Sequence, residues 1–265
     1  GSTINPDTST APITTNPVVL KAGHINANNV LTNSGTLTAS GALTVNASDA
    51  VGNSGAIRTA VPLVIKTGTL TNTSTSSIKS QSTADITAST VVHNQGSLQA
   101  QTLTVTAPII DNNQGNLTGE QVLNLNASGQ ITNVSGSIAG KILLLNTPQL
   151  DNTHGSISTN SDLTLNNAHL DNSTGSISAK NLTLNNQNLT NTDGQLLAAE
   201  NLTSTADTIV NSNGSMAAGT GLTVNASTSI NNDKGVLQGQ TTRITTASLI
   251  NTNNLDTGGV IGQNT

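Results

Sequence analysis

Hydrophobic positions recur along the chain in a unit of about twenty residues. The unit is clearest over residues 150–186, where LDNTHGSISTNSDLTLNN is followed, after two residues, by LDNSTGSISAKNLTLNN. Within each copy aliphatic residues alternate with polar ones, and Asn, Gly, Ser and Thr separate the alternating stretches. Alternation with a period of two is typical of strands with one buried face. The pattern therefore predicts stacked copies of one small β unit rather than a single globular core.

An aliphatic residue two positions before an Asn opens each unit, at steps of 18 to 22 residues. The twelve asparagines are Asn33, Asn53, Asn72, Asn94, Asn112, Asn133, Asn152, Asn172, Asn191, Asn211, Asn232 and Asn251. We expect them to stack as a structural ladder, with side-chain amides bonded from one unit to the next and to the turn backbone. A ladder that binds a ligand is the alternative.

A Gly follows the Asn by two or three residues in ten units, and we expect it to supply a positive φ at a corner. Each unit holds three short alternating segments separated by turns, and no stretch of helical periodicity. Three short strands per ~20 residues predict an all-β fold, a parallel β-helix (solenoid) of about twelve ~20-residue coils. At the strand spacing of ~4.8 Å, twelve coils would extend over roughly 55–60 Å.

The repeat defines three expected segments. Residues 1–30 contain Pro6, Pro12 and Pro17 and are expected to form an irregular N-terminal segment that could hold a partial coil. Residues 31–255 form the β-helix repeat domain, and residues 256–265 a frayed C-terminal tail. We expect a monomer whose open coil edges could associate end to end. Gly1-Ser2 resembles a cloning remnant, which suggests an excised part of a longer protein.

Composition excludes several classes of function. The chain has no Phe, Tyr, Trp or Cys and a single Met, so its core must be aliphatic and it has no disulfide or thiol chemistry. The 8 basic residues are scattered, which argues against nucleic-acid binding. No run approaches 18 apolar residues, so no transmembrane helix is predicted. Coils of this length leave no room for substrate-binding loops, and we predict neither an enzyme nor a cofactor.

Asp151 and Asp171 fall at the same position of successive units and are weak metal candidates, because two stacked carboxylates could share a cation. A solvated turn pair is the favoured interpretation, and the calcium-solenoid pattern GGxGxDxUx is absent. The histidines do not share a repeat position, which argues against metal ligation: His24, His93, His154 and His169. Outward Thr residues form an interrupted row that argues against ice binding, and the many N-x-S/T sequons follow from composition.

The unit L-x-N-x-x-G-x-I-x-A-x-x-L-x-L-x-N resembles the filamentous haemagglutinin repeat of two-partner-secretion exoproteins, over about residues 31–251. The resemblance implies a right-handed β-helix that is exported through an outer-membrane transporter and lies outside a Gram-negative cell, secreted or on its outer surface. Members of this family are virulence-associated adhesins or effectors of contact-dependent growth inhibition, and both branches stay open here.

The resemblance and the uniform repeat together predict a structural stalk segment that presents a distal adhesive or receptor-binding region. The alternative is that the β-helix itself binds a target-cell receptor or polysaccharide along a polar Asn/Thr face. A stalk should tolerate outward substitutions, whereas a binding face should lose affinity from a localised set of them.

Overall fold

The computed structural model describes the backbone of residues 2–4, 11–13, 18–20, 23–27, 29–252 and 259–262, and the side chains of residues 23–27, 29–252 and 259. The chain divides into two compact units, Gly1–Thr132 with Ser137–Lys141, and Asn133–Gly136 with Ile142–Thr265. All regular structure in the described residues is β-strand. No helix there is long and apolar enough to cross a membrane.

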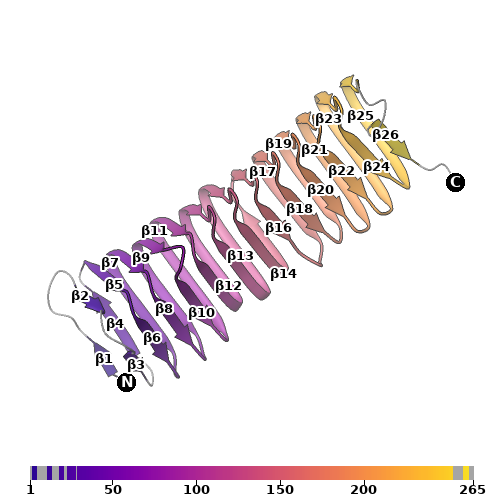
Figure 1. Cartoon of the computed structure of the whole chain (residues 1–265). Coiled ribbons are helices and arrows are strands. Elements are labelled where there is room, and N and C mark those ends of the chain that lie inside the picture. The colour runs from indigo at the N-terminus through magenta and orange to yellow at the C-terminus, as the bar shows by residue number, and fades with distance from the viewer. Residues whose placement is uncertain are drawn as a thin grey trace. The chain divides into compact units, whose positions relative to one another are not determined.

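The first unit is built of strands that follow one another along the chain and stack on the strand one repeat earlier (Figure 1). They are β1 (Ser2–Ile4), β2 (Ala11–Ile13), β3 (Val18–Leu20), β4 (Gly23–Ala27), β5 (Val30–Asn33), β6 (Thr36–Ala39), β7 (Leu43–Asn53), β8 (Ala56–Thr59), β9 (Leu63–Asn72), β10 (Ser77–Ser80), β11 (Thr83–Asn94), β12 (Ser97–Asp111) and β13 (Asn116–Thr132). The residues of β14 (Ser137–Asn146) are divided between the two units.

The second unit repeats the same arrangement (Figure 1). Its strands are β15 (Gln149–Asp151), β16 (Ser156–Ser158), β17 (Leu163–Asp171), β18 (Ser176–Ala179), β19 (Leu182–Thr190), β20 (Gln195–Ala198), β21 (Asn201–Val210), β22 (Ser215–Ala218), β23 (Gly221–Asn231), β24 (Val236–Gly239), β25 (Thr241–Ile250) and β26 (Gly259–Gly262).

Strand pairing within each unit is parallel and joins residues one repeat apart. In the second unit Leu150 lies opposite Leu170, Ile157 opposite Ile177, and Leu163 opposite Leu182. Equivalent positions of neighbouring copies therefore coincide, as a coil closing on the coil before it requires. The predicted parallel β-helix is confirmed, with about 11 turns of ~20 residues.

The core consists of the aliphatic positions that define the repeat. Leu150, Ile157, Leu163 and Leu165 represent one coil of the second unit, and each is at most 2% exposed. Along each strand these buried side chains alternate with half-buried or exposed polar ones. The single methionine, Met216, occupies the position of Leu196 and Leu237 in the neighbouring coils. The interior is narrow and has the same width in every coil, so aliphatic side chains of similar volume fill it without aromatic residues.

The coils differ from the expected three short strands, because some strands continue around a corner. In β7 the register shifts between Ala47 and Ala50, where the two exposed residues Ser48 and Asp49 follow each other. An extra outward residue turns the chain while the parallel hydrogen bonds resume beyond it. The corner of β7 contains no glycine or proline, whereas the same corner of β9 contains Gly68, where an added Cβ would lie 2.4 Å from the carbonyl oxygen of Asp49.

Short strands also lie in the two terminal segments. β1, β2 and β3 lie in the segment expected to be irregular or to hold a partial coil. They pair in parallel with β4, β5 and β6, respectively. β26 pairs with β24, within the expected C-terminal tail. The other residues of these two expectations, among them Pro6 and Pro17, lie outside the described part of the chain.

Candidate functional site

The asparagines of the repeat form a continuous column in each unit. In the second unit Asn152 Nδ2 donates to Asn172 Oδ1 at 2.7 Å, and Asn172 Nδ2 donates to Asn191 Oδ1 at 2.7 Å. The same contact joins Asn133 to Asn152, Asn191 to Asn211, Asn211 to Asn232 and Asn232 to Asn251, at 2.7–2.8 Å. Each of these amides donates toward the C-terminal end, so the dipoles of the side chains are aligned along the column.

The first unit carries an equivalent column. Its contacts run from Asn33 to Asn53, from Asn53 to Asn72, from Asn72 to Asn94 and from Asn94 to Asn112, at 2.7–2.8 Å. All of these side chains are at most 1% exposed. The column begins at Asn33, because the residue paired with it in the preceding coil is Ile13. Asn33 Oδ1 accordingly has no hydrogen-bond partner among the described residues.

Each amide nitrogen also satisfies the turn that follows it. Asn152 Nδ2 lies 3.2 Å from the carbonyl oxygen of Gly155 in its own coil and 3.2 Å from that of Ser176 in the next. The Gly155 carbonyl oxygen also accepts the backbone N–H of Ser176 at 2.9 Å, so the backbone itself bonds this corner to the next coil. The asparagine column thus adds side-chain hydrogen bonds to corners that the backbone already joins from coil to coil.

The coil that lacks the glycine uses a serine instead. Ser76 is 4% exposed, and its hydroxyl lies 2.7 Å from Asn72 Oδ1 and 2.6 Å from the carbonyl oxygen of Thr73. A hydroxyl can donate only one hydrogen at a time, so these two oxygens compete for it. The column passes through this coil without interruption.

The expected role of the glycine column is wrong. The positive φ falls on the residue before the glycine: Gln114, Ser135, His154, Thr174, Asp193, Asn213 and Lys234, with φ of 54–63°. The glycine is required by space, since a Cβ on Gly175 would lie 2.1 Å from the carbonyl oxygen of Asn152. The corner of one coil therefore packs against the backbone of the coil before it, and only a residue without a side chain fits.

Asp151 and Asp171 lie directly opposite each other in neighbouring coils. Asp151 Oδ1 accepts the backbone N–H of Thr153 at 2.9 Å and its hydroxyl at 2.6 Å. Asp171 Oδ1 accepts the same two groups of Ser173 at 2.9 and 2.6 Å. These are the contacts of an Asx turn, so one oxygen of each carboxylate is engaged by its own turn.

No group of three or more His, Cys, Asp or Glu side chains is placed to hold a metal ion in residues 23–27 and 29–252. His93 does meet a carboxylate, with Nδ1 2.9 Å from Asp111 Oδ2, and both side chains are partly exposed. The two residues occupy the same position of successive coils.

Asparagines on the outer face of the coils, half-buried at Asn26 and Asn46 and exposed at Asn166 and Asn185, form paired contacts that the repeat pattern alone did not single out. Asn46 Nδ2 lies 2.8 Å from Asn26 Oδ1, and Asn185 Nδ2 lies 2.8 Å from Asn166 Oδ1. They follow the closing aliphatic pair of each unit, so writing the copies under one another would have revealed them. These pairs lie toward solvent, in contrast to the buried column.

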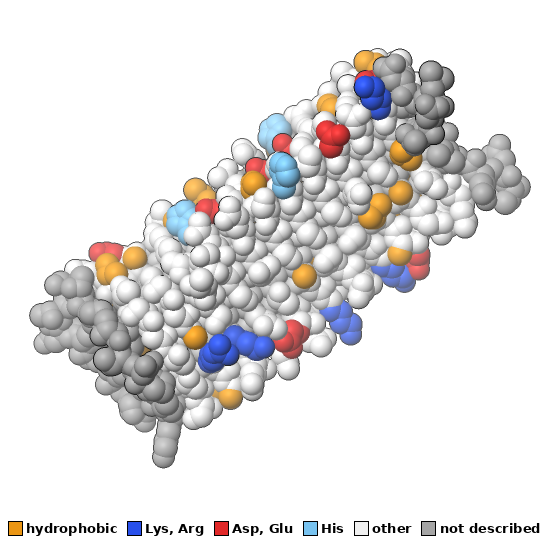
Figure 2. Space-filling view, viewed as in Figure 1, with side chains coloured by type: hydrophobic (Ala, Val, Ile, Leu, Met, Phe, Trp, Pro, Cys, Tyr) orange, Lys and Arg blue, Asp and Glu red, His pale blue; other side chains and the backbone are white. Residues whose placement is uncertain are grey.

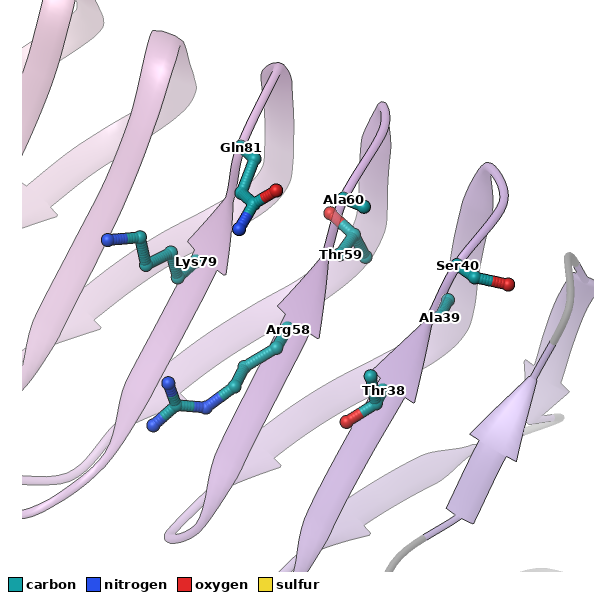
Figure 3. Close-up of a pocket in the computed structure, with 8 residues that line it drawn as sticks. All are labelled: Thr38, Ala39, Ser40, Arg58, Thr59, Ala60, Lys79 and Gln81. Carbon is teal, nitrogen blue, oxygen red and sulfur yellow. The ribbon is translucent and has the colours of Figure 1, made fainter.

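The surface is otherwise poor in charge, and Figure 2 shows mostly backbone and uncharged polar side chains on the face in view. Two surface hollows lie at equivalent corners of the coils. The hollow of the first unit, about 440 Å³, is lined by Thr38, Arg58, Thr59, Lys79 and Gln81 among others (Figure 3). We call it the Arg58 hollow.

The second unit has a hollow of about 390 Å³ around Lys180, which we call the Lys180 hollow. There the ammonium group of Lys180 is 3.4 Å from a carboxylate oxygen of Glu200. The basic residue of this hollow therefore has an acidic partner.

The repeat that builds these columns is also recognised at the level of protein families. The haemagglutinin repeat family model matches residues 7–147, 134–216 and 193–264. These matches extend over nearly the whole chain, and the chain belongs to the haemagglutinin repeat family. No curated protein and no solved structure matches it. The chain is a β-solenoid repeat region of the filamentous haemagglutinin type.

Proposed function

We propose that the chain is a stalk segment of a large bacterial exoprotein, which holds a distal adhesive or receptor-binding region away from the cell. The observation that carries this proposal is the buried asparagine column in each unit. Its hydrogen bonds of 2.7–2.8 Å join each coil to the next through the same contact. Uniform coils are suited to setting a distance, because one coil can be added or removed without changing its neighbours.

Membership of the haemagglutinin repeat family supports a secreted or cell-surface location. We propose export through an outer-membrane transporter of the two-partner type and a final position on the outer surface of a Gram-negative cell. A chain without cysteine is compatible with such a route, because no disulfide can form before export is complete.

A second function is favoured by the polar outward rows. Exposed asparagine pairs such as Asn166 and Asn185 present amide groups in regular array, and amides can bind hydroxyl groups of a polysaccharide. In that case the β-helix itself would be the adhesive surface.

Binding of the labelled chain to intact bacterial and mammalian cells tests the proposal, with an unrelated β-helix as the control. The stalk function predicts no saturable binding above the control. Saturable binding to one cell type that is abolished in the double variant Asn166→Ala, Asn185→Ala would contradict the stalk function and support the adhesive surface.

A further inference from the structure

Two basic side chains lie directly opposite each other in neighbouring coils of the first unit. Arg58 is in β8 and Lys79 in β10, and the two residues are register partners in the parallel pairing of these strands. Figure 3 shows both side chains leaving their strands on the same side. Neither forms a hydrogen bond or an ion pair with any described residue.

This arrangement is unfavourable for folding alone. Like charges directly opposite each other in a sheet repel, and the chain has only 8 basic residues among 265. The neighbours in the same row are neutral, with Thr38 before Arg58 and Gln99 after Lys79. A stalk that needed only outward polar residues would be served by Thr or Gln at both positions.

The hollow beside the pair also contains neutral polar side chains. The side-chain amide of Gln81 and the hydroxyl of Thr38 lie in its lining. Two cationic groups are thus accompanied by neutral hydrogen-bond donors.

We propose that the Arg58 hollow binds a single oxyanion group, a phosphate, sulfate or carboxylate, carried on a small polyhydroxylated ligand such as an acidic sugar. The guanidinium of Arg58 can hold two oxygens in a bidentate contact, and the ammonium of Lys79 adds a point charge. The hydroxyl of Thr38 and the amide of Gln81 can bind further oxygens of the ligand.

The extent of the basic row sets the size of the anionic group. Neighbouring coils are ~4.8 Å apart, so one oxyanion can contact the cationic groups of both coils. Thr38 and Gln99, on either side of the pair in this row, are neutral. The row of basic residues therefore extends over two coils only and cannot pair with successive charges of a polyanion. In the Lys180 hollow the basic group is already paired with Glu200, so we assign the site to the first unit alone.

Calorimetric titration of the whole chain with inorganic phosphate, sulfate, glucuronate and glucose tests the site. We expect saturable binding of the oxyanions, weakened by added salt, and none of glucose. Tighter binding of glucuronate than of both inorganic ions would assign the ligand to an acidic sugar, and the reverse order to a free ion. The absence of saturable binding by all three anions would overturn the proposal.

Arg58→Thr and Lys79→Gln give each residue the side chain of its neutral neighbour in the row. We expect each to lower the affinity about tenfold or more, as the loss of a charge-assisted hydrogen bond implies. The same variants should raise the melting temperature of the anion-free chain, because they remove the repulsion. Thr38→Val should weaken binding while keeping the fold.

Lys66→Asn is the matched control. Lys66 is an exposed residue of β9 in the same unit, and its register partner in the preceding coil is Asn46. Its removal changes the net charge equally and should leave the affinity unchanged. An equal loss of affinity in Lys66→Asn would reduce the effect to non-specific charge and would contradict the site. These results are independent of the stalk function, which cell binding tests separately.

Discussion

Asn152 donates from its amide nitrogen to the side-chain oxygen of Asn172 at 2.7 Å, and both side chains are fully buried. Within the column an asparagine accepts from one neighbour and donates to the next, so no water is required to satisfy it. The column therefore joins the turns of successive coils through polar groups inside a solenoid whose core is otherwise aliphatic. Buried and completely paired networks of this kind favour one register over all others.

Asn172→Ala should interrupt the column and lower the free energy of unfolding by ~2–4 kcal/mol, because it leaves buried polar groups of the neighbouring coils unpaired. Urea denaturation of the purified chain measures the change. Asn185→Ala removes an exposed amide from a contact of 2.8 Å and should cost at most ~0.5 kcal/mol. Equal losses in the two variants would show that the column has no special role.

Gly175→Ala should destabilise the chain by ~3 kcal/mol or more, since the added Cβ would lie 2.1 Å from a backbone oxygen that cannot move alone. Gly52→Ala is the comparison, because the nearest atom to its added Cβ is 3.9 Å away. That variant should be neutral or stabilising, as the unfolded chain loses freedom. A tolerated Gly175→Ala would mean that the corners are not tightly packed.

Thr174→Asn should raise the free energy of unfolding by ~0.5–1 kcal/mol, because Thr174 has φ 54° and a β-branched residue is disfavoured there. Asn213 occupies the same turn position with φ 54°, and Asn213→Thr should have the opposite effect. Thermal unfolding of both variants provides the measurement. Two changes of the same sign would exclude backbone strain as their cause.

Ser204→Val should stabilise the chain by ~1–2 kcal/mol. Ser204 is fully buried, stands in a core row between Leu184 and Val224, and has a hydroxyl without a partner among the described residues. Valine removes that hydroxyl and restores the aliphatic row. Ser204→Ala removes the hydroxyl without adding volume and should give a smaller gain, whereas a loss in both would show that the hydroxyl is satisfied.

The repeat made the coil length, the parallel stacking and the core positions predictable, because every coil solves the same packing problem. Leu150 and Leu170 coincide in space for the reason that they coincide in the aligned copies. The buried asparagine spacing was visible for the same reason. A period of about twenty residues leaves little freedom once parallel pairing is assumed.

Local exceptions were not predictable from the same pattern. A glycine at position 175 is compatible either with a positive φ or with close packing of the backbone, and the sequence does not distinguish the two. The structure shows that Thr174 has the positive φ and that Gly175 is required by close packing. Arg58 and Lys79 lie five and seven residues after their asparagines, because the coil without a glycine has extra turn residues. Counting from the asparagines therefore obscures their register, which follows from aligning Ile57 with Ile78 directly before them and is confirmed by the strand pairing.

Deletion of residues 152–210 determines whether the coils are interchangeable units of a stalk. It joins Asp151 to Asn211 and removes three whole coils while keeping the asparagine register. We expect a folded chain with a strand-rich circular dichroism spectrum and a maximum dimension reduced by ~14 Å in small-angle scattering, at ~4.8 Å per coil. Deletion of residues 152–200 breaks the register and should not fold. An unfolded product from the in-register deletion, or an unchanged dimension, would contradict a stalk of interchangeable coils.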